Sequence, residues 1–544
     1  MSSAVDAGDL VIGITPFGEP DARLAAAVSR AGGLGVLDLG TTGREARQAW
    51  EDIGEWVADG RYGVRAAAGC RLTPADLPDA PATGGPEGGA PGPHTVVLGV
   101  DSPWPVEAVS DRCRVLAEVT DLDEALEAVR AGVHGLIARG SESGGRIGAL
   151  GTFVLLQRLL ADPRVPLPVW ACGGIGPHTA AASVLGGAAG VVLDTQLALL
   201  AESGLPEDRA AVIRSMDGSE TTVLDGCRVL RRRGRATQHI QPSLTVGQDG
   251  FLAAQFAERW RDVGCTVRGI TDAIREAAHE AVRNGSAVTA LRPGAPLSTR
   301  LGTRLPIAQG PMTRVSDQGG FACAVAAGGA LPFIALALAG REQARSMLEE
   351  AAAALDGRPW GVGVLGFAPE EIRNAQLEAV REIRPSHAII AGGRPSQAKA
   401  LERDGIATYL HVPSPGLLRQ FLQAGARRFV FEGSECGGHV GPRNSFPLWE
   451  AQIAVVEDFL DDTAHDPRRT ANTDGIDGTD AADSTDGTDG AGIEILFAGG
   501  VHDERSAAMV AALAAPLTRR GVAIGSLMGT AYLFTEEAVA HGAV

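Results

Sequence analysis

The fold is indicated by Gly140-Ser-Glu-Ser-Gly-Gly-Arg146-Ile-Gly148, because the chain repeats this stretch 293 residues later as Gly433-Ser-Glu-Cys-Gly-Gly-His439-Val-Gly441. A second pair of similar segments, residues 24–34 and 321–331, is separated by 297 residues. Two independent blocks at almost the same separation indicate an internal duplication, which has to be recognised before any fold is assigned. The sequence therefore predicts two copies of one domain.

A third pair of segments, residues 171–175 and 497–501, is separated by 326 residues. The additional separation is accounted for by an insert at 461–490, which is rich in Asp, Thr and Gly. Such a low-complexity polar stretch is typical of a disordered surface loop. A second stretch of this kind, from Pro74 to Pro93, interrupts the first copy. We therefore expect each copy to carry one disordered insertion.

Short apolar runs alternate with amphipathic helical stretches in each copy. In the second copy these runs are Trp360–Leu365, His387–Ile390, Ala407–His411, Arg428–Glu432, Ile493–Ala498 and Val522–Gly525. Apolar strands separated by helices are typical of a parallel sheet covered by helices. About eight strands over roughly 240 residues favour a closed barrel. We expect an α/β chain with two tandem TIM (β/α)8 barrels, at 1–204 and 300–544, joined by a helical cap or linker at 205–299.

Composition excludes several classes of protein. The net charge is −18, which argues against a general surface for nucleic acid or for anionic membranes. The seven cysteines are scattered without a CxxC pair, so neither a disulfide framework nor a zinc site is indicated. The N-terminus has no signal-peptide pattern, and no apolar run is long enough to span a membrane. We expect a cytoplasmic protein without a metal.

The candidate catalytic residue is His439. It follows the predicted strand that ends at Glu432, in a loop that contains Gly437 and Gly438. Glycines let the backbone approach a flat ligand closely. Imidazole can exchange a proton near neutral pH, as the deprotonation of a carbon acid requires. Because chemistry in a parallel barrel lies at the carboxyl ends of the strands, we predict that this loop is the active site.

Two glycine turns near the end of the chain are candidate phosphate sites. Ala498-Gly499-Gly500-Val501 ends a predicted strand, and Asp503 can cap the helix that follows. Gly525-Ser526 and Gly529-Thr530 follow at the last strand. Free backbone N–H groups and a helix N-terminus bind phosphate, and the last two loops of such barrels are its usual place. At the start of the second copy, Met312 can lie against a ring face.

Together these motifs resemble the nitronate monooxygenase, or 2-nitropropane dioxygenase-like, family of FMN barrels, which includes the flavin-dependent enoyl-acyl-carrier-protein reductases. The resemblance covers residues 301–544, from a Pro306–Met312 opening strand to the Gly529-Thr530 turn. It implies that His439 is the catalytic base and that FMN lies between the opening strand and the Glu432–His439 loop. The residues assigned to FMN are Gln309, Gly310, Pro311, Met312, Gly363, Glu432, Gly437, Gly438, Ala498, Gly499, Gly500, Gly525, Ser526, Gly529 and Thr530.

The sequence also departs from the family pattern. Gly363 stands where the family has an Asn that contacts the flavin, and the first copy has Arg146 in place of His439. It also has Asp194-Thr195, which we align with Gly525-Ser526. A carboxylate repels a phosphate, and arginine cannot act as a general base. We interpret the first copy as a degenerate barrel; the alternative is that Arg146 holds the phosphate of a flavin or of an acyl-phosphopantetheine arm.

The tandem arrangement resembles paired barrels at the front of some polyketide or polyunsaturated-fatty-acid type synthases, so one interpretation is that the chain is a fragment of a larger synthase. This resemblance implies an FMN-dependent oxidoreductase that acts on a carrier-bound enoyl thioester, with NADPH or NADH as electron donor and an acyl carrier protein or other synthase domains as partners. Two alternatives stay open. One is a nitronate monooxygenase proper, in which His439 deprotonates the substrate and reduced flavin meets O2. The other is a non-catalytic docking module.

Overall fold

The computed structural model describes residues 9–57, 59–77, 92–233, 238–241, 244–284, 290–464, 490 and 492–540. The chain divides into two compact units, Met1–His279 and Glu280–Val544. Most of the region expected to connect the barrels therefore belongs to the first unit. The Pro74–Pro93 segment and the 461–490 insert, both expected to be disordered, lie largely outside the described residues. No helix within the described ranges is long and apolar enough to cross a membrane.

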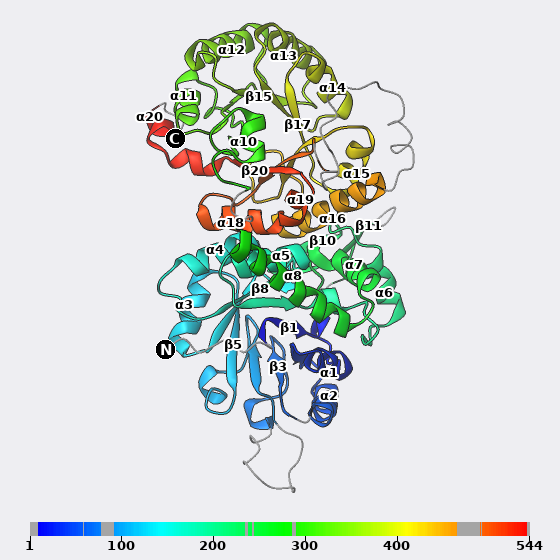
Figure 1. Ribbon diagram of the computed structural model, residues 1–544. Helices are drawn as coiled ribbons and strands as arrows, with labels where there is room; N and C mark the ends of the chain where they lie inside the picture. Colours follow the sequence, from blue (N-terminus) through cyan, green and yellow to red (C-terminus); the bar gives the residue numbers. More distant parts are fainter. Residues whose placement is uncertain are drawn as a thin grey trace. The chain divides into compact units, whose positions relative to one another are not determined.

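The first unit contains a closed parallel barrel of eight strands, as predicted (Figure 1). Its strands are β1 (Val11–Ile14), β2 (Leu34–Asp38), β3 (Tyr62–Ala66), β4 (Thr95–Leu98), β5 (Arg114–Val119), β6 (Gly135–Arg139), β8 (Val169–Cys172) and β9 (Gly190–Leu193). Helices α1 (Ala22–Arg30), α2 (Gly43–Trp56), α3 (Leu122–Ala131), α4 (Thr152–Ala161) and α5 (Pro177–Leu185) follow strands of this barrel. Buried side chains such as Ile12, Val36 and Trp170 fill its interior, as barrels of this size require.

The region after the first barrel is only partly helical. The predicted helix over Ile270–Arg283 lies within α8 (Val263–Asn284), and α6 (Glu207–Arg214) and α7 (Leu252–Arg259) precede it. Between α6 and α7, however, β10 (Thr221–Leu224), β11 (Cys227–Arg233) and β12 (Gln238–Gln241) form an antiparallel sheet that β7 (Gly145–Arg146) joins. The helical assignment of this stretch was wrong. The dipeptide Asp225-Gly226 is the sequence feature that could have predicted this hairpin. Both residues have positive φ, a backbone typical of tight hairpins.

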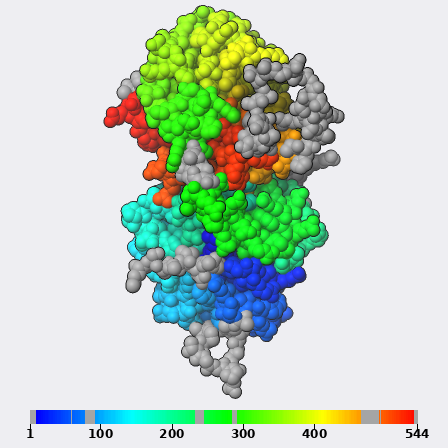
Figure 2. All heavy atoms as spheres, in the orientation of Figure 1, coloured from blue at the N-terminus to red at the C-terminus, as the bar shows by residue number. Residues whose placement is uncertain are grey.

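The second unit is also a barrel. Its strands are β13 (Ile307–Gln309), β14 (Phe333–Ala335), β15 (Gly361–Leu365), β16 (His387–Ala391), β17 (Ala407–His411), β18 (Arg428–Glu432), β19 (Glu494–Ala498) and β20 (Ala523–Met528). Its helices are α10 (Pro296–Leu301), α11 (Gly319–Ala327), α12 (Arg341–Leu355), α13 (Glu370–Ile383), α14 (Pro395–Arg403), α15 (Pro415–Gln423), α16 (Ser445–Ala464), α18 (Glu504–Leu513), α19 (Ala515–Arg519) and α20 (Glu536–Ala540). Helices α12 and α13 form a continuous outer surface in the space-filling view (Figure 2). The six strands predicted in this copy are confirmed within one residue of their expected ends, except that β20 ends three residues later than predicted.

The second barrel closes through a single bridge and one side chain. Strands β13 and β14 lie at the two ends of the sheet order, and Ala308 pairs with Leu331 just before β14. The Gln309 side chain extends this closure, because its Oε1 accepts a hydrogen bond of 3.1 Å from the Phe333 N–H and its Nε2 donates to the Gly310 carbonyl. Gln309 thus joins β13 to β14.

The repeat seen in the sequence is reproduced in hydrogen bonds. Glu142 accepts from the Thr152 N–H at the start of α4, at 3.0 and 3.1 Å. Glu435 accepts in the same way from the Ser445 N–H at the start of α16, at 3.1 and 2.8 Å. A carboxylate at a helix N-terminus satisfies otherwise unpaired N–H groups and interacts favourably with the helix dipole. In each copy, the repeated glutamate therefore fixes the loop to the following helix.

Candidate functional site

The strand registers allow the two barrels to be compared residue by residue. In the first barrel Cys172 pairs with Val192, and in the second Ala498 pairs with Leu527. Counting two residues further along each last strand, Asp194 corresponds to Gly529 and not to Gly525. Our alignment of Asp194-Thr195 with Gly525-Ser526 was therefore wrong by four residues, because the last strand is longer in the second copy.

Applied to the other strands, the same registers match six positions of the first barrel with six positions of the second. All of them lie at the carboxyl ends of strands, and we call them the mouth layer. In the first barrel these positions hold Asp38, Arg65, Glu118, Arg139, Cys172 and Asp194. In the second barrel they hold Ala335, Gly363, His411, Glu432, Ala498 and Gly529. Side chains alternate along a strand, so all six lie on the interior face. The layer is filled with charge in one barrel and lined mostly by small residues in the other.

Gly363 occupies the position where the sequence departs from the family pattern. A Cβ at this residue would collide with the ring of Pro311, which follows β13. The departure therefore has a local cause: Pro311 fills the space of a side chain at this position. At Gly529, by contrast, a Cβ would meet only the Met312 sulfur, at 3.6 Å. Pro311, Gly363, Met312 and Gly529 thus lie together at one edge of the mouth layer, as the resemblance implies.

His411 and Glu432 are the two polar members of the second mouth layer. The His411 Nδ1 lies 2.6 Å from a Glu432 carboxylate oxygen, and both side chains are largely buried. This contact lacks hydrogen-bond geometry, and neither ring nitrogen has a hydrogen-bond partner among the described residues. Buried polar atoms are rarely left unpaired. Sequence reasoning assigned Glu432 but missed His411, although it is a histidine at the end of a predicted strand.

His439 lies in the loop that leads from Glu432 to α16. The loop is held at its base, where the Ser434 N–H donates to the Arg443 carbonyl at 2.8 Å. Beyond that bond the loop is open, since a Cβ added at Gly437 or Gly438 would meet no atom within 4 Å. The His439 ring is exposed and lies 4.9 Å from the Phe367 ring, centroid to centroid. His439 is therefore free to act on a ligand, but the structure does not bring it into contact with His411.

The turn at Gly499-Gly500 is suited to an anion. Both residues have positive φ, 122° and 75°, which glycine adopts at little cost. Asp503 caps α18 through the Ser506 N–H at 2.8 Å. Within the described ranges, no acceptor takes the Gly500 N–H. A free backbone N–H beside a helix N-terminus is the arrangement that binds phosphate.

Two of the residues assigned to phosphate binding do not reach this turn. Gly525 and Ser526 lie inside β20 and not at its end. A Cβ at Gly525 would collide with the Pro306 carbonyl, so glycine is needed there for strand packing. Ser526 lies between two interior positions, hence on the side facing the helices, and its buried Oγ has no partner among the described residues. Gly529 and Thr530, directly after the strand, occupy the expected place.

Cys436 is a packing residue in this loop. Burial raises the pKa of its thiol well above the usual value, and the nearby Glu432 and Glu435 carboxylates add to the shift. A protonated thiol is a poor nucleophile. The side chain also packs against the core of the second barrel.

Comparisons with known proteins give matches to parts of the chain. The model of the nitronate monooxygenase family matches residues 92–280. A nitronate monooxygenase from Paraburkholderia phytofirmans is 39% identical over 105 residues, which make up 17% of this chain and 28% of that relative. The chain thus spans only 28% of the length of this curated relative.

Solved structures show similar chains. FabK from Thermotoga maritima matches with 21% identity and a TM-score of 0.41, over 51% of this chain and 96% of its own. A nitroalkane oxidase from Streptomyces ansochromogenes matches with 23% identity and a TM-score of 0.37, over 51% of this chain and 99% of its own.

Proposed function

We propose, starting from the match of residues 92–280 to the model of the nitronate monooxygenase family, that this chain is an FMN-dependent oxidoreductase whose working site is the second barrel. The second barrel repeats the loop, the capping glutamate and the Gly-Gly turn of the matched segment. The observation that carries the proposal is the mouth layer: four of its six positions in the second barrel are Ala or Gly. Small residues leave room for a flat ring over the strand ends.

The residues of the second barrel fit an FMN. Gly499 and Gly500, with the N-terminus of α18, would hold the phosphate, and Gly529 and Thr530 would border it. The edge formed by Pro311 and Met312 would lie against the ring system. His411, whose buried ring nitrogens lack partners among the described residues, offers a donor or acceptor to a polar ring atom. When bound, the flavin supplies hydride or electron transfer.

His439 is proposed as the general base or acid. It is exposed on a glycine loop, so it can reach a substrate placed over the mouth layer and exchange a proton with it. Glu432 lies beside His411, with a carboxylate oxygen 2.6 Å from the His411 Nδ1. The two histidines therefore have different roles: one at the substrate, and one fixed at the strand ends.

An acyl chain is the substrate best supported by the surface. Exposed large apolar side chains occur on three loops that follow strands of this barrel: Leu338 after β14, Phe367 after β15 and Phe534 after β20, with exposures of 60%, 55% and 85%. Because β20, β13, β14 and β15 are consecutive around the barrel, these loops are grouped at the same end. Clustered exposed apolar groups mark binding sites. We therefore favour a carrier-bound enoyl thioester, reduced with NADPH or NADH, and an acyl carrier protein as partner.

The test is an absorbance spectrum of the purified chain, followed by cofactor release and turnover assays. We expect about one FMN per chain and oxidation of NADPH or NADH with an enoyl thioester. The duplication supplies a matched control: His439→Ala should strongly lower turnover and keep the flavin, while Arg146→Ala, at the corresponding position of the first barrel, should change neither. Turnover of alkyl nitronates with O2, without enoyl reduction, would support the nitronate monooxygenase alternative. A chain that takes up no FMN would refute the enzyme proposal.

A further inference from the structure

The first barrel differs from the second in what covers its strand ends. Residues 244–251, which we call the covering segment, include the short helix η6 (Gln248–Phe251). The Gln248 N–H donates to the Glu142 carbonyl at 2.7 Å. A Cβ at Gly144 would collide with the Thr245 carbonyl, and one at Gly247 with the Glu142 carbonyl. The covering segment is therefore packed, backbone against backbone, on the loop that corresponds to the His439 loop.

The loop itself is also held in a sheet. Gly145 and Arg146, which correspond to Gly438 and His439, form β7 and pair with Arg228 and Cys227 of β11. The Arg146 side chain binds the Asp101 carboxylate at 3.1 Å and the Ile147 carbonyl at 3.0 Å. These contacts use the guanidinium within the chain, so they argue against Arg146 as a phosphate ligand.

In the first barrel, a carboxyl group of the same chain lies in the turn that corresponds to Gly499-Gly500. Asp249 of the covering segment is fully buried, and its Oδ2 accepts a hydrogen bond of 3.0 Å from the Gly174 N–H. Gly173 and Gly174 have φ of 117° and 66°, as Gly499 and Gly500 have 122° and 75°. The N–H that is free at Gly500 is thus satisfied at Gly174 by a carboxyl group of the same chain.

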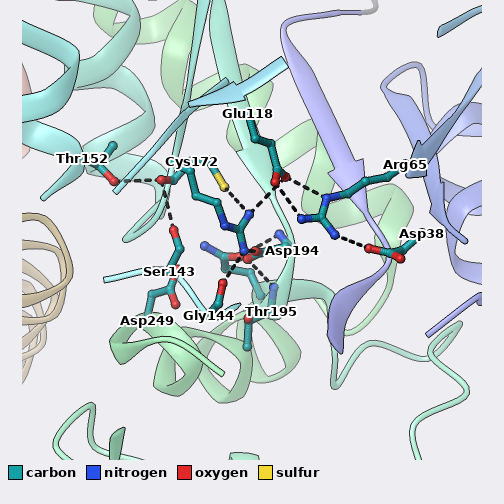
Figure 3. A network of polar contacts seen from close by, with 12 residues as sticks. Asp38, Arg65, Glu118, Ser143, Gly144, Thr152, Cys172, Asp194, Thr195 and Asp249 are labelled. Atoms are coloured by element: carbon teal, nitrogen blue, oxygen red, sulfur yellow. Dashed lines mark hydrogen bonds and ion pairs between the residues drawn. The ribbon is translucent and has the colours of Figure 1, made fainter. Parts of the chain in front are cut away.

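Charged side chains occupy most of the mouth layer of the first barrel (Figure 3). Arg139 contacts Glu118 at 3.3 Å, Asp194 at 3.4 Å and the Gly144 carbonyl at 2.5 Å. Arg65 binds Glu118 at 2.7 and 2.8 Å and also pairs with Asp38. A buried network of this kind is costly to break, since removal of one partner leaves an uncompensated charge. In the first barrel these side chains therefore stand where the second barrel has mostly Ala and Gly.

We infer that the first barrel is closed to flavin by its own chain, with Asp249 seated in the turn where a flavin phosphate would bind and the mouth layer filled by ion pairs. The electrostatics agree: burial, with a further contribution from Asp194, raises the pKa of Asp249 to about 8. A place that disfavours one added negative charge disfavours a phosphate dianion more. The inference is independent of whether the second barrel binds FMN.

Amide hydrogen exchange of the full chain, with and without saturating FMN, tests this inference. We expect the Gly173–Gly176 segment to exchange slowly in both conditions. Asp249→Ala should accelerate exchange there at least tenfold, whereas Asp249→Asn, which keeps an oxygen acceptor, should accelerate it less. Asp162→Ala, which removes a carboxylate that pairs with Arg164 at the C-terminal end of α4, should leave the segment unchanged.

The outcomes separate the two proposals. Slowing of exchange by FMN at 173–176, or no response to Asp249→Ala, would overturn the inference. If FMN slows exchange at 499–501 alone, both the inference and the FMN site in the second barrel are supported. If FMN slows neither segment while Asp249→Ala has its effect, the first barrel is closed as inferred and the proposed function fails.

Discussion

Replacing Asp249 by Asn should alter how the stability of the first barrel depends on pH. The carboxyl group has a pKa of about 8 in the folded protein against 3.8 for an ordinary Asp. The folded state therefore keeps a proton that the unfolded state loses above about pH 4. Its stabilising contribution is complete below pH 4, falls as the pH rises through the window from 4 to 8, and is constant above it.

The magnitude follows from the linkage between protons and folding. One group of this kind can lower the free energy of unfolding by at most about 1.4 kcal/mol per pH unit. Between pH 5 and pH 8 the wild-type chain should thus lose up to about 4 kcal/mol that the variant keeps. The groups that interact with Asp249 are Asp194, Glu142, Arg139, Arg228 and Cys172, and all of them are present in both proteins.

Urea denaturation at pH 5, 6, 7 and 8, followed by tryptophan fluorescence, measures this difference. Five of the seven tryptophans lie in the first unit, so the signal reports chiefly on that unit. Asp162→Asn is the matched control. Its pKa is lowered to about 2 by hydrogen bonds with Arg164, so its loss should not change the slope between pH 5 and 8. Parallel curves for the wild type and Asp249→Asn would refute the account of the buried carboxyl group.

Three further predictions concern the second barrel. His439→Ala should lower turnover by roughly 10²- to 10⁴-fold, the usual contribution of a general acid or base, with FMN content unchanged by absorbance. Gly529→Asp introduces the carboxylate that Asp194 provides in the first barrel, at a position with a negative φ and room for a Cβ. FMN should then bind at least tenfold more weakly, because like charges repel. Unchanged affinity in a flavin titration would contradict the phosphate assignment. Gln309→Ala removes the side chain that joins β13 to β14. It should lower the free energy of unfolding by on the order of 1–3 kcal/mol, measured by thermal denaturation. Loss of FMN binding in a fully folded variant would instead indicate a direct contact between Gln309 and FMN.

The duplication and the barrels could be predicted from the sequence, because both depend on local signals. The repeated Gly-Ser-Glu loop and the apolar runs, such as Arg428–Glu432, are visible without any contact between distant residues. Gly499 and Gly500 could be predicted for the same reason, since a strand followed by two glycines is itself a turn signal.

What could not be predicted depends on pairing between strands. The correspondence of Asp194 with Gly529 follows from register, and a difference in strand length hides it in the sequence. The role of Gln309 arises because β13 and β14 share only one backbone bridge. Asp249 lies 75 residues beyond the turn that it occupies, and no sequence spacing relates the two.

The charged mouth layer of the first barrel has a practical consequence for hydrogen-exchange measurements of ligand binding. Each molecule contains two copies of one fold, of which one is inferred to be permanently silent towards flavin, in a fixed one-to-one ratio. The silent copy can serve as an internal standard: a ligand-dependent signal in peptides of β18 and β19 can be normalised to β6 and β8 in the same sample. Errors in protein concentration, temperature or buffer then cancel.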